Sequence, residues 1–532
     1  MNPSPSPSPS HRFWIPGTIC TVAFLIFVAV QAQPELERNI KSWITGALLI
    51  LMVALNFLWL IFLSRFPGRR RLLAAVVVIV GVAVLSQLLT VDGTIDGTGR
   101  PKLVWKKSRA NVPLPAPAPW PVTGLAPLEG EKPVTDVPQF FGPARDGVVR
   151  GARLSLDWNT TPPKQLWRQP IGGGWSAFAV VGERAFTQEQ RGEGECVTCY
   201  DVFTGRLLWA HTNQARFFQW QGGEGPRATP TVVSNRVFAI GGTGVLDCLE
   251  ADTGRRVWTR NVLGENKLPN LTWGVSASPL VFDDSVVVTG GLANSPTVLA
   301  YHRQTGEPLW RAGTDKCSYA SPVLATVAGR RVILSVNAAS LTVHDSTNGV
   351  VLLDHPWSNE KWPKAAQPVV LDGDRVFLSA GYGIGCELLQ LKFLSTGKLA
   401  ATEVWKGRSM KNQFNSSAYR DGFIYGLDDG FLACVDAATG ERRWKDGRFG
   451  SGQSLLVDDL VLIQSEPGPI VLARARPDAY EELARLPALS SKTWNHPTLA
   501  GRLLLVRNDR EAACYQFLGV APAPTPAAAA GK

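Results

Sequence analysis

Two cysteines separated by two residues, Cys196 and Cys199, form the first pattern in this sequence that could do chemistry. Such a pair can bind a metal or exchange disulfides, and it holds a c-type haem when histidine follows it. Tyr200 follows here, so the haem is excluded. The stretch ECVTCYDV is typical of a β-strand, in which residues three apart point to opposite faces. We therefore expect the thiols of this pair to be buried and unreactive.

A second set of polar and aromatic side chains interrupts short stretches that otherwise resemble apolar strands. Arginine can hold a carboxylate through two parallel hydrogen bonds, tryptophan can stack on a planar ring, and histidine can transfer protons near neutral pH. Alternatively, the same side chains fill a narrow channel in the centre of the fold and form hydrogen bonds to the protein there. The candidates for a ligand site are Glu189, Arg227, Thr229, Trp273, Tyr319, Gln367, Asn415, Gln453, Trp494, Asn495 and His496.

Two adjacent carboxylates, Asp428 and Asp429, precede a glycine. Carboxylates in this position either lie in a solvated turn or bind a cation, and the solvated turn is the commoner role. The sequence contains no phosphate-binding loop, no G-x-S-x-G serine motif and no H-E-x-x-H zinc motif. It therefore offers no complete catalytic signature.

The chain that must position these side chains is periodic from about residue 138. Thr-Gly turns recur at intervals of about 43 to 52 residues, and four short strand-like stretches fill each interval. A period in the forties with four strands per unit is typical of a propeller blade. The glycines of these turns are Gly205, Gly254, Gly306, Gly397 and Gly440, with a weaker Asn348-Gly349 turn between them.

One unit, residues 228–260, shows the pattern of a blade. The stretches ATPTVV, RVFAIG, VLDCLE and RRVWTR alternate apolar and polar residues, as half-buried antiparallel strands do. The glycine of the turn supplies a positive φ, and a tryptophan follows on the outermost strand. A small residue, often cysteine, stands five residues before the threonine of the turn, which indicates a packing requirement. The tryptophans at this offset are Trp209, Trp258, Trp310 and Trp444.

Eight segments resemble the first strand of a blade, which predicts eight blades. Seven is the main alternative, because the fourth and seventh units are degenerate. Only three strands follow the last of these segments, so the N-terminal stretch 157–170 is expected to complete the final blade and close the ring. The segments are 174–181, 226–233, 274–281, 318–325, 365–372, 414–421, 452–459 and 493–500.

The first 90 residues contain three apolar runs, 13–30, 43–63 and 72–89, each about long enough for a membrane-spanning helix. Arg65 and the run Arg69–Arg71 lie between the second and third, and positive loops stay in the cytoplasm. The remainder of the chain is therefore expected on the exported side of a bacterial inner membrane, in the periplasm. Cleavage of the first run as a signal peptide, near VQAQ, is the alternative.

The sequence divides into a membrane anchor over 1–90, a Pro-rich linker over 91–137, a propeller over 138–520 and a disordered, low-complexity tail over 521–532. The net charge is +10, and the arginines beside the apolar runs account for part of it. No basic helix with interleaved aromatic residues occurs, so a nucleic-acid partner is not expected.

The segments LDCLEADTGRRVW, ACVDAATGERRW and LAYHRQTGEPLW resemble the repeat of pyrroloquinoline-quinone (PQQ) propellers, which ends in A-x-D-x-x-T-G-x-x-x-W. QFFGPARDG, GPRATPTV, WNHP and RNDREAACY resemble a membrane-bound bacterial subgroup described as PQQ-binding-like. The resemblance covers about residues 138–520 and implies an all-β, eight-bladed propeller of four-stranded antiparallel blades. It also implies that each repeat tryptophan docks on the neighbouring blade.

Active quinoprotein dehydrogenases of this family hold the quinone between a tryptophan and a disulfide of adjacent cysteines, and bind Ca²⁺ through acidic and amide oxygens. This sequence has no adjacent cysteines, and no Glu, Asn and Asp set can be matched to the ion ligands. The resemblance therefore implies either a propeller without cofactor, as in the outer-membrane assembly scaffold, or one that binds PQQ with Ca²⁺.

Two functions follow. The preferred one is a membrane-anchored binding or scaffold module, whose partners are the lipid bilayer and either an envelope protein or a small ligand at the channel mouth. The alternative is a membrane-bound, PQQ-dependent quinoprotein dehydrogenase that oxidises an alcohol or sugar.

Overall fold

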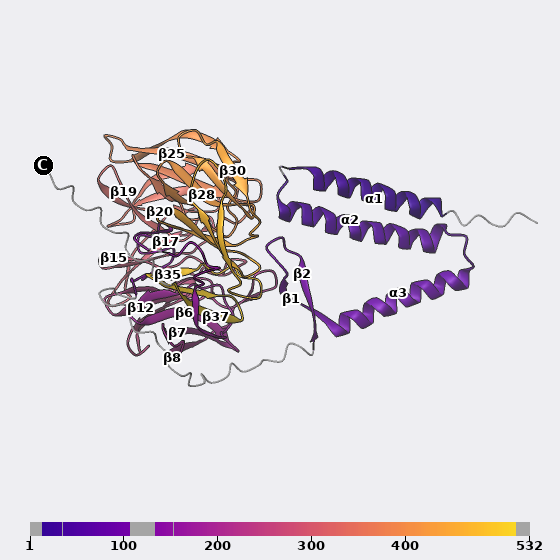
Figure 1. The fold of residues 1–532 in the computed structure, drawn as a ribbon, viewed down its shortest axis with the longest axis horizontal. Coiled ribbons are helices and arrows are strands. Elements are labelled where there is room, and N and C mark those ends of the chain that lie inside the picture. Colours follow the sequence, from indigo (N-terminus) through magenta and orange to yellow (C-terminus); the bar gives the residue numbers. More distant parts are fainter. Residues whose placement is uncertain (1–12, 35, 107–133, 153, 518–532) are drawn as a thin grey trace, which may run out of the picture. The chain divides into compact units, whose positions relative to one another are not determined.

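A computed structural model of the chain describes residues 13–34, 36–106, 134–152 and 154–517. It contains two compact units, Met1–Asn111 and Val112–Lys532, the first mainly helical and the second a ring of sheets (Figure 1). The tail predicted for 521–532 lies outside the described residues, as does most of the predicted linker.

The first unit contains three helices that are long and apolar enough to cross a membrane. About 20 residues at 1.5 Å per residue cover the ~30 Å hydrocarbon layer. The helices bury almost none of their side chains, as expected for surfaces that face lipid. They are α1 (Trp14–Ala32), α2 (Arg38–Leu58), which continues as a π-turn η1 (Trp59–Leu63), and α3 (Gly68–Leu88).

A β-hairpin follows α3 directly. Strand β1 (Leu89–Thr94) pairs antiparallel with β2 (Pro101–Trp105) in a separate two-stranded sheet. These residues were expected to begin the linker. The β-branched and aromatic residues in LTV and KLVW are the local signal for strands that composition alone did not reveal.

Within the described residues of the second unit, eight sheets form the blades of a propeller, which confirms eight over seven. In each blade the strands follow one another from the innermost to the outermost. A connecting segment then leads from the outermost strand of one blade to the innermost strand of the next. Blades 1 to 4 contain β5 (Ala179–Val181), β6 (Arg184–Arg191), β7 (Gly194–Asp201), β8 (Leu207–Gln214); β11 (Thr231–Val233), β12 (Arg236–Ile240), β13 (Val245–Glu250), β14 (Arg256–Asn261); β15 (Leu280–Phe282), β16 (Ser285–Thr289), β17 (Val298–His302), β18 (Pro308–Ala312); and β19 (Val323–Val327), β20 (Arg330–Val336), β21 (Ser340–Asp345), β22 (Val351–Pro356).

The second half of the ring repeats the same order. Blades 5 to 8 contain β23 (Val369–Leu371), β24 (Arg375–Ala380), β25 (Gly385–Phe393), β26 (Leu399–Gly407); β27 (Ala418–Arg420), β28 (Phe423–Asp428), β29 (Phe431–Asp436), β30 (Arg442–Asp446); β31 (Gln453–Val457), β32 (Leu460–Gln464), β33 (Ile470–Arg474), β34 (Glu482–Leu486); and β35 (Thr498–Ala500), β36 (Leu503–Arg507), β37 (Glu511–Gln516) with β4 (Lys164–Pro170). Strand β3 (Val148–Val149) adds a fifth, innermost strand to the sheet of blade 7, and the smaller elements between blades are β9 (Phe218–Gln219), β10 (Gly223–Glu224) and α4 (Val262–Glu265).

The ring is closed by its two ends. Strand β4, from the N-terminal side, pairs antiparallel with β37 and places Trp167 opposite Cys514. The final blade therefore combines the first and last strands of the propeller, as the sequence predicted. Closure in this way leaves no long unpaired edge at the junction.

Tryptophans of the outer strands contact the turns of the next blade. The indole N–H of Trp258 donates to the carbonyl of Arg303 at 3.0 Å, beside the turn that contains Gly306. A methyl group on any of these turn glycines would overlap the facing ring, so glycine is required both for its positive φ and for this close approach. The pairs are Trp167 with Gly205, Trp209 with Gly254, Trp258 with Gly306, Trp310 with Gly349 and Trp405 with Gly440; the Trp444 indole donates to Arg476 of blade 7.

The small residues before each turn lie directly opposite these tryptophans. Cys248 pairs across the strands with Trp258, and Cys199 pairs with Trp209. A bulky side chain at this position would displace the ring from the next blade. All eight cysteines are free thiols, seven of them buried, and burial raises the pKa of Cys199 and Cys248 to about 12.

Replacement of Gly254 by alanine should lower the free energy of unfolding by about 2–4 kcal/mol, through left-handed strain and overlap with Trp209. An added Cβ would lie 2.4 Å from that ring. Gly397 is the matched control, because its φ is also positive but no atom lies within 4 Å of the added Cβ. Gly397→Ala should cost only about 1–2 kcal/mol. Equal losses in denaturant unfolding of the two variants would contradict the docking contact.

Candidate functional site

A belt of hydroxyl groups joins neighbouring blades around the channel. Ala177 N donates to Thr229 Oγ1 at 3.0 Å, Thr229 N to Ser278 Oγ at 2.9 Å, and Ser278 N to Ser321 Oγ at 2.9 Å. Each hydroxyl belongs to the segment that leads into an inner strand, hereafter the lead-in segment. Thr229 therefore satisfies a backbone group of the preceding blade, and its oxygen lies in a buried contact.

Residues 137–149, hereafter the plug, cross the channel between the inner strands. Val137 exchanges two backbone hydrogen bonds of 2.8 Å with Val180 of blade 1, and Val232 N of blade 2 donates to Pro138 O at 2.7 Å. At the far end of the plug, β3 runs parallel to β31 of blade 7. The stretch QFFGPARDG, whose role the sequence did not reveal, therefore fills the interior of the ring.

Arg145 fixes the middle of the plug. Its guanidinium donates to Pro279 O at 2.8 Å and to Ser278 O at 3.1 Å, both in blade 3. Gln367, of blade 5, donates from its amide to Arg145 O at 3.1 Å. Burial lowers the pKa of Arg145 to about 9. Gln367, predicted as a ligand residue, therefore holds the plug.

His496 lies against the plug rather than at the channel mouth. Its ring contacts Phe140 and Phe141 edge-on, at centroid distances of 5.6 and 5.1 Å, and its Nδ1 lies 2.9 Å from Pro497 O. The Nε2 atom is buried without a hydrogen-bond partner and lines a small cavity beside the plug. Burial lowers the pKa of His496 to about 4, so the ring is neutral at neutral pH.

The channel mouth is filled by side chains that stand four residues before their inner strands. Trp494 of blade 8 lies 4.8 Å from Trp175 of blade 1 and 5.1 Å from Phe414 of blade 6, between ring centroids. Lys492 Nζ lies 4.1 Å from the Trp494 centroid, and the Trp494 indole donates to Glu466 at 2.7 Å. Rings from three blades therefore close the mouth.

Trp273, Tyr319 and Arg227 lie beside that aromatic group. Trp273 packs edge-on against Tyr319 at 5.5 Å. A Cβ at Gly222 would lie 3.2 Å from Arg227 Nη2 and 3.3 Å from Trp273 Cδ1, and the carbonyl of Gly222 accepts the Trp175 indole N–H at 2.5 Å. The structure thus brings four of the predicted residues together, hereafter the mouth cluster: Arg227, Trp273, Tyr319 and Trp494, with Trp175 and Phe414.

The guanidinium of Arg227 is already engaged. It donates to the carbonyls of Gly223, at 2.8 Å, and Gly225, and it lies 4.6 Å above the ring of Phe217. Burial lowers its pKa to about 9. Arg227 therefore braces the hairpin β9–β10 instead of presenting its fork to a carboxylate.

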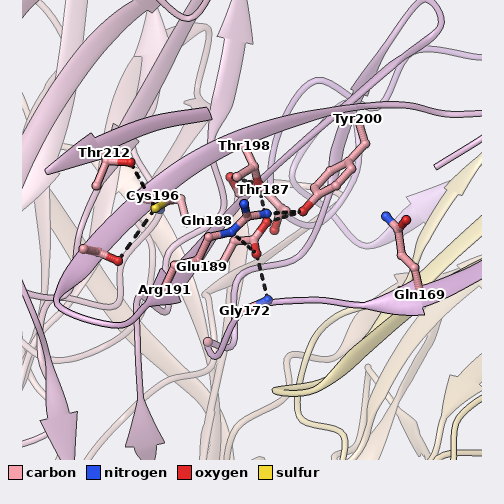
Figure 2. Close-up of polar contacts among 12 residues, drawn as sticks. Gln169, Gly172, Thr187, Gln188, Glu189, Arg191, Cys196, Thr198, Tyr200 and Thr212 are labelled. Carbon is pink, nitrogen blue, oxygen red and sulfur yellow. Dashed lines mark hydrogen bonds and ion pairs between the residues drawn. The ribbon is translucent and has the colours of Figure 1, made fainter. Parts of the chain in front are cut away.

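Glu189 is fully buried, in a hydrogen-bonded network between blades 1 and 8 (Figure 2). Its carboxylate accepts hydrogen bonds from Gly172 N at 2.7 Å, Thr198 Oγ1 at 2.7 Å and Tyr200 OH at 2.5 Å. Burial would raise the pKa of Glu189, but the charges of Arg191 and Arg507 together with these hydrogen bonds lower it below its ordinary value. The carboxylate is an anionic anchor within the fold, with its oxygens turned away from solvent.

Arg507 supplies a second positive charge to this network, beside the ion pair of Arg191 with Glu189 at 3.1 Å, and was not predicted. It is fully buried and donates to Thr187 Oγ1 at 2.7 Å, Gln188 O at 2.8 Å and Gly172 O at 2.9 Å. The stretch RNDRE is the turn between β36 and β37, and its mixed charges gave no local sign that Arg507 would be buried. Only the closing of blade 8 on blade 1 brings its positive charge near Glu189.

The remaining predicted amides hold backbone carbonyls. Each is buried, and each bridges parts of the lead-in segments or a neighbouring strand. The contacts are Asn415 to Leu427 O at 3.3 Å, Gln453 to Phe414 O at 3.0 Å and Trp494 O at 2.9 Å, and Asn495 to Gly174 O at 3.2 Å and Ser176 O at 2.8 Å.

The expectation of a solvated turn at Asp428 is wrong. Asp428 ends β28 and is fully buried, and its carboxylate lies 2.6 Å from Lys445, 3.0 Å from Arg442 and 3.4 Å from Lys411. The three cationic side chains come from the neighbouring strand and the lead-in segment, so the sequence around Asp428 does not reveal them. This carboxylate is neutralised internally and is not positioned as an ion ligand.

The residues at the mouth do not fit a quinone held with Ca²⁺. Trp494 is covered by two rings and an ammonium group, and the Arg227 donors are bound to backbone carbonyls. Throughout the described part of the chain, no group of three or more His, Cys, Asp or Glu side chains is arranged to hold a metal ion. The stacking slot and the carboxylate partner that such a cofactor requires are therefore not assembled.

The chain is similar to several known proteins. A profile of the PQQ-repeat family described as outer membrane protein assembly factor BamB matches residues 161–261 and 193–446, together more than half of the chain. Outer membrane protein assembly factor BamB of Burkholderia pseudomallei is 24% identical over 381 residues, which are 66% of this chain and 91% of that protein. Tetrathionate hydrolase of Acidithiobacillus ferrooxidans is 24% identical over 216 residues, 37% of this chain and only 42% of the hydrolase.

A solved structure shows the same fold. The quinohemoprotein alcohol dehydrogenase ADHIIG of Pseudomonas putida HK5 matches with a TM-score of 0.52 and 14% identity. The match covers 74% of this chain and 82% of the dehydrogenase. At this identity the likeness concerns the propeller architecture alone.

Proposed function

This chain belongs to the family of PQQ-repeat propellers described as outer membrane protein assembly factor BamB, and we propose that it is a protein-binding module anchored at a bacterial cell envelope. The relative from Burkholderia pseudomallei is described as an assembly factor, so a protein is the class of partner that we infer. The three apolar helices supply the anchor.

The arginines near the second helix connection support an exported propeller. Arg65 lies in the short connection between η1 and α3, and Arg69 to Arg71 lie in the first turn of α3. Positive residues that flank a span favour the cytoplasmic side, so the end of α3 and all that follows it lie outside. The propeller then lies on the periplasmic side of the bacterial inner membrane.

The filled channel favours binding at a surface over catalysis in a pocket. The plug occupies the interior, and the mouth cluster closes the lead-in end. Small-molecule sites are concave and keep a few polar groups free to meet the ligand. The polar groups predicted as ligands are instead bonded to the protein itself.

The hairpin β9–β10 at the mouth is the observation on which this proposal rests. Its turn exposes Trp220 by 46%, and Phe218 beside it is 41% exposed. Tryptophan and arginine dominate binding energy at protein interfaces, and a rigid loop loses little entropy on binding. Gln219 Oε1 accepts hydrogen bonds from Gln221 N and Gly222 N, which fixes the turn from within. The exposed tryptophan is therefore presented on a preorganised support.

The first test places a photo-crosslinking amino acid at Trp220 in cells that produce the full chain. We expect a discrete adduct with a protein partner, and Phe218→Ala should weaken the complex by about 2 kcal/mol, roughly thirtyfold in Kd. The matched control is Leu309, which is 45% exposed on the outer strand of blade 3. An adduct of equal yield at both positions, or none at either, would contradict a partner-binding mouth.

The dehydrogenase alternative is tested on the purified chain with pyrroloquinoline quinone and Ca²⁺. We expect no saturable change in tryptophan fluorescence and no dye-linked oxidation of alcohols or sugars. Saturable binding with turnover, both lost in Arg227→Ala, would replace the binding module by an oxidoreductase.

A further inference from the structure

The hairpin β1–β2 separates its side chains by chemistry. Leu89 pairs with Trp105 and Val91 with Leu103, and paired residues of antiparallel strands point to the same face. The opposite face contains Thr90, Val104 and the ion pair of Asp92 with Lys102, whose charged atoms are 4.0 Å apart. The hairpin therefore has one wholly apolar face, hereafter the apolar hairpin face: Leu89, Val91, Leu103 and Trp105.

Two of the four side chains on this face are exposed within the unit, whereas Leu89 and Val91 are partly buried. Leu103 is 60% exposed and Trp105 is 57% exposed. An isolated two-stranded hairpin is marginally stable in water, and it gains little if its apolar side chains stay hydrated. Something outside the unit must cover these residues.

Both ends of the hairpin are fixed to helices of the same unit. No residue separates Leu88, the end of α3, from Leu89. At the turn, a Cβ on Gly99 would lie 2.9 Å from Trp43 Nε1 near the start of α2, and Thr94 and Thr98 are buried. The hairpin thus runs from the end of α3 to the start of α2, across one end of the helices (Figure 1).

We propose that the apolar hairpin face lies in the interfacial layer of the bilayer that α3 spans. Leu89 follows the last residue of a span, so it is at headgroup depth, where tryptophan is enriched and amphipathic elements lie flat. Asp92 and Lys102 then face water. The hairpin is a lipid-binding clamp between α2 and α3, and this inference rests on the membrane anchor of the proposed function.

The test uses the full chain reconstituted in vesicles of phosphatidylethanolamine and phosphatidylglycerol. A single environment-sensitive fluorophore is attached in a Cys20→Ser background at Leu103→Cys or, as the matched control on the other face, at Lys102→Cys. The native thiols other than Cys20 are buried and do not react in the folded protein. Trp105→Cys provides a second position on the apolar face.

We expect the probes at 103 and 105 to be quenched several-fold more by a nitroxide at the lipid headgroup than the probe at 102, with the reverse order for aqueous iodide. Equal quenching at all positions would overturn the proposal. So would a probe at 103 that neither agent reaches, because protein would then cover the face.

A fluorophore on native Cys20, exposed on α1, separates the two levels of inference. Quenching by acyl-chain nitroxide at Cys20 without quenching at 103 overturns the hairpin proposal and leaves the membrane anchor intact. Absence of lipid quenching at Cys20 contradicts the anchor itself.

Discussion

Replacement of Arg507 by methionine is expected to lower the free energy of unfolding by about 3–5 kcal/mol, because it removes several buried hydrogen bonds of a charged group and a positive charge near the buried Glu189. The change removes hydrogen bonds to blade 1 and leaves Glu189 buried with less positive charge around it. Because Arg507 lies where the ring closes, the loss falls on the junction of blades 8 and 1. The measurement is denaturant unfolding of the full chain in detergent, followed by tryptophan fluorescence.

Two further variants make this result specific. Arg474→Met removes a partly exposed ion pair with Asp459, 3.0 Å long, and should cost at most about 1 kcal/mol. Combined with Arg507→Met, Glu189→Gln should cost less than the sum of the single changes, because the carboxylate is then no longer charged. Strict additivity would show that the two side chains do not stabilise each other.

His496→Gln is expected to remove a large part of the acid sensitivity of the propeller. The pKa of His496 is lowered to about 4, against an ordinary value of 6.5. Above pH 6.5 the imidazole ring is neutral in both the folded and the unfolded protein, so His496 does not lower the free energy of unfolding there. As the pH falls from about 6.5 to 4, the imidazole binds a proton in the unfolded chain but not in the folded protein, so the free energy of unfolding decreases. The full loss is about 3 kcal/mol for such a shift.

This prediction is measured as the unfolding midpoint against pH for both proteins. The wild type should lose stability between pH 6.5 and 4, and the variant should lose less over the same interval. Some slope will remain, because burial also lowers the pKa of His344. Parallel curves for the two proteins would show that His496 is not buried against the plug.

The blade pattern could be predicted from the sequence because it is local and repeated. The turn glycine, the tryptophan four residues later and the small residue opposite it lie within one hairpin, so a single unit reveals all three. Trp405 escaped this pattern. Strands β25 and β26 are longer than their counterparts, which moves the tryptophan away from Gly397 while it still reaches the next blade.

The contacts that join distant parts of the chain could not be predicted, because they connect residues hundreds of positions apart. Gln367 meets Arg145, and Arg507 meets Gln188, only after the ring closes. The mouth cluster had a usable signal, since Trp175, Phe414 and Trp494 each stand four residues before an inner strand. The polarity of the buried amides suggested contacts with a ligand. In the structure they donate instead to backbone carbonyls, many of them in the lead-in segments, because a buried carbonyl needs a hydrogen-bond partner.

The plug also determines how the propeller responds to tension. Force on the chain from the N-terminal side reaches Val137 before it reaches β4. There it meets backbone hydrogen bonds to Val180 and Val232, then Arg145 in blade 3 and Leu456 in blade 7. These bonds lie on several blades and share the strain, whereas β4 alone would peel from β37 one pair at a time. The plug therefore protects the closing strand β4 from force that is applied to the chain before Val137.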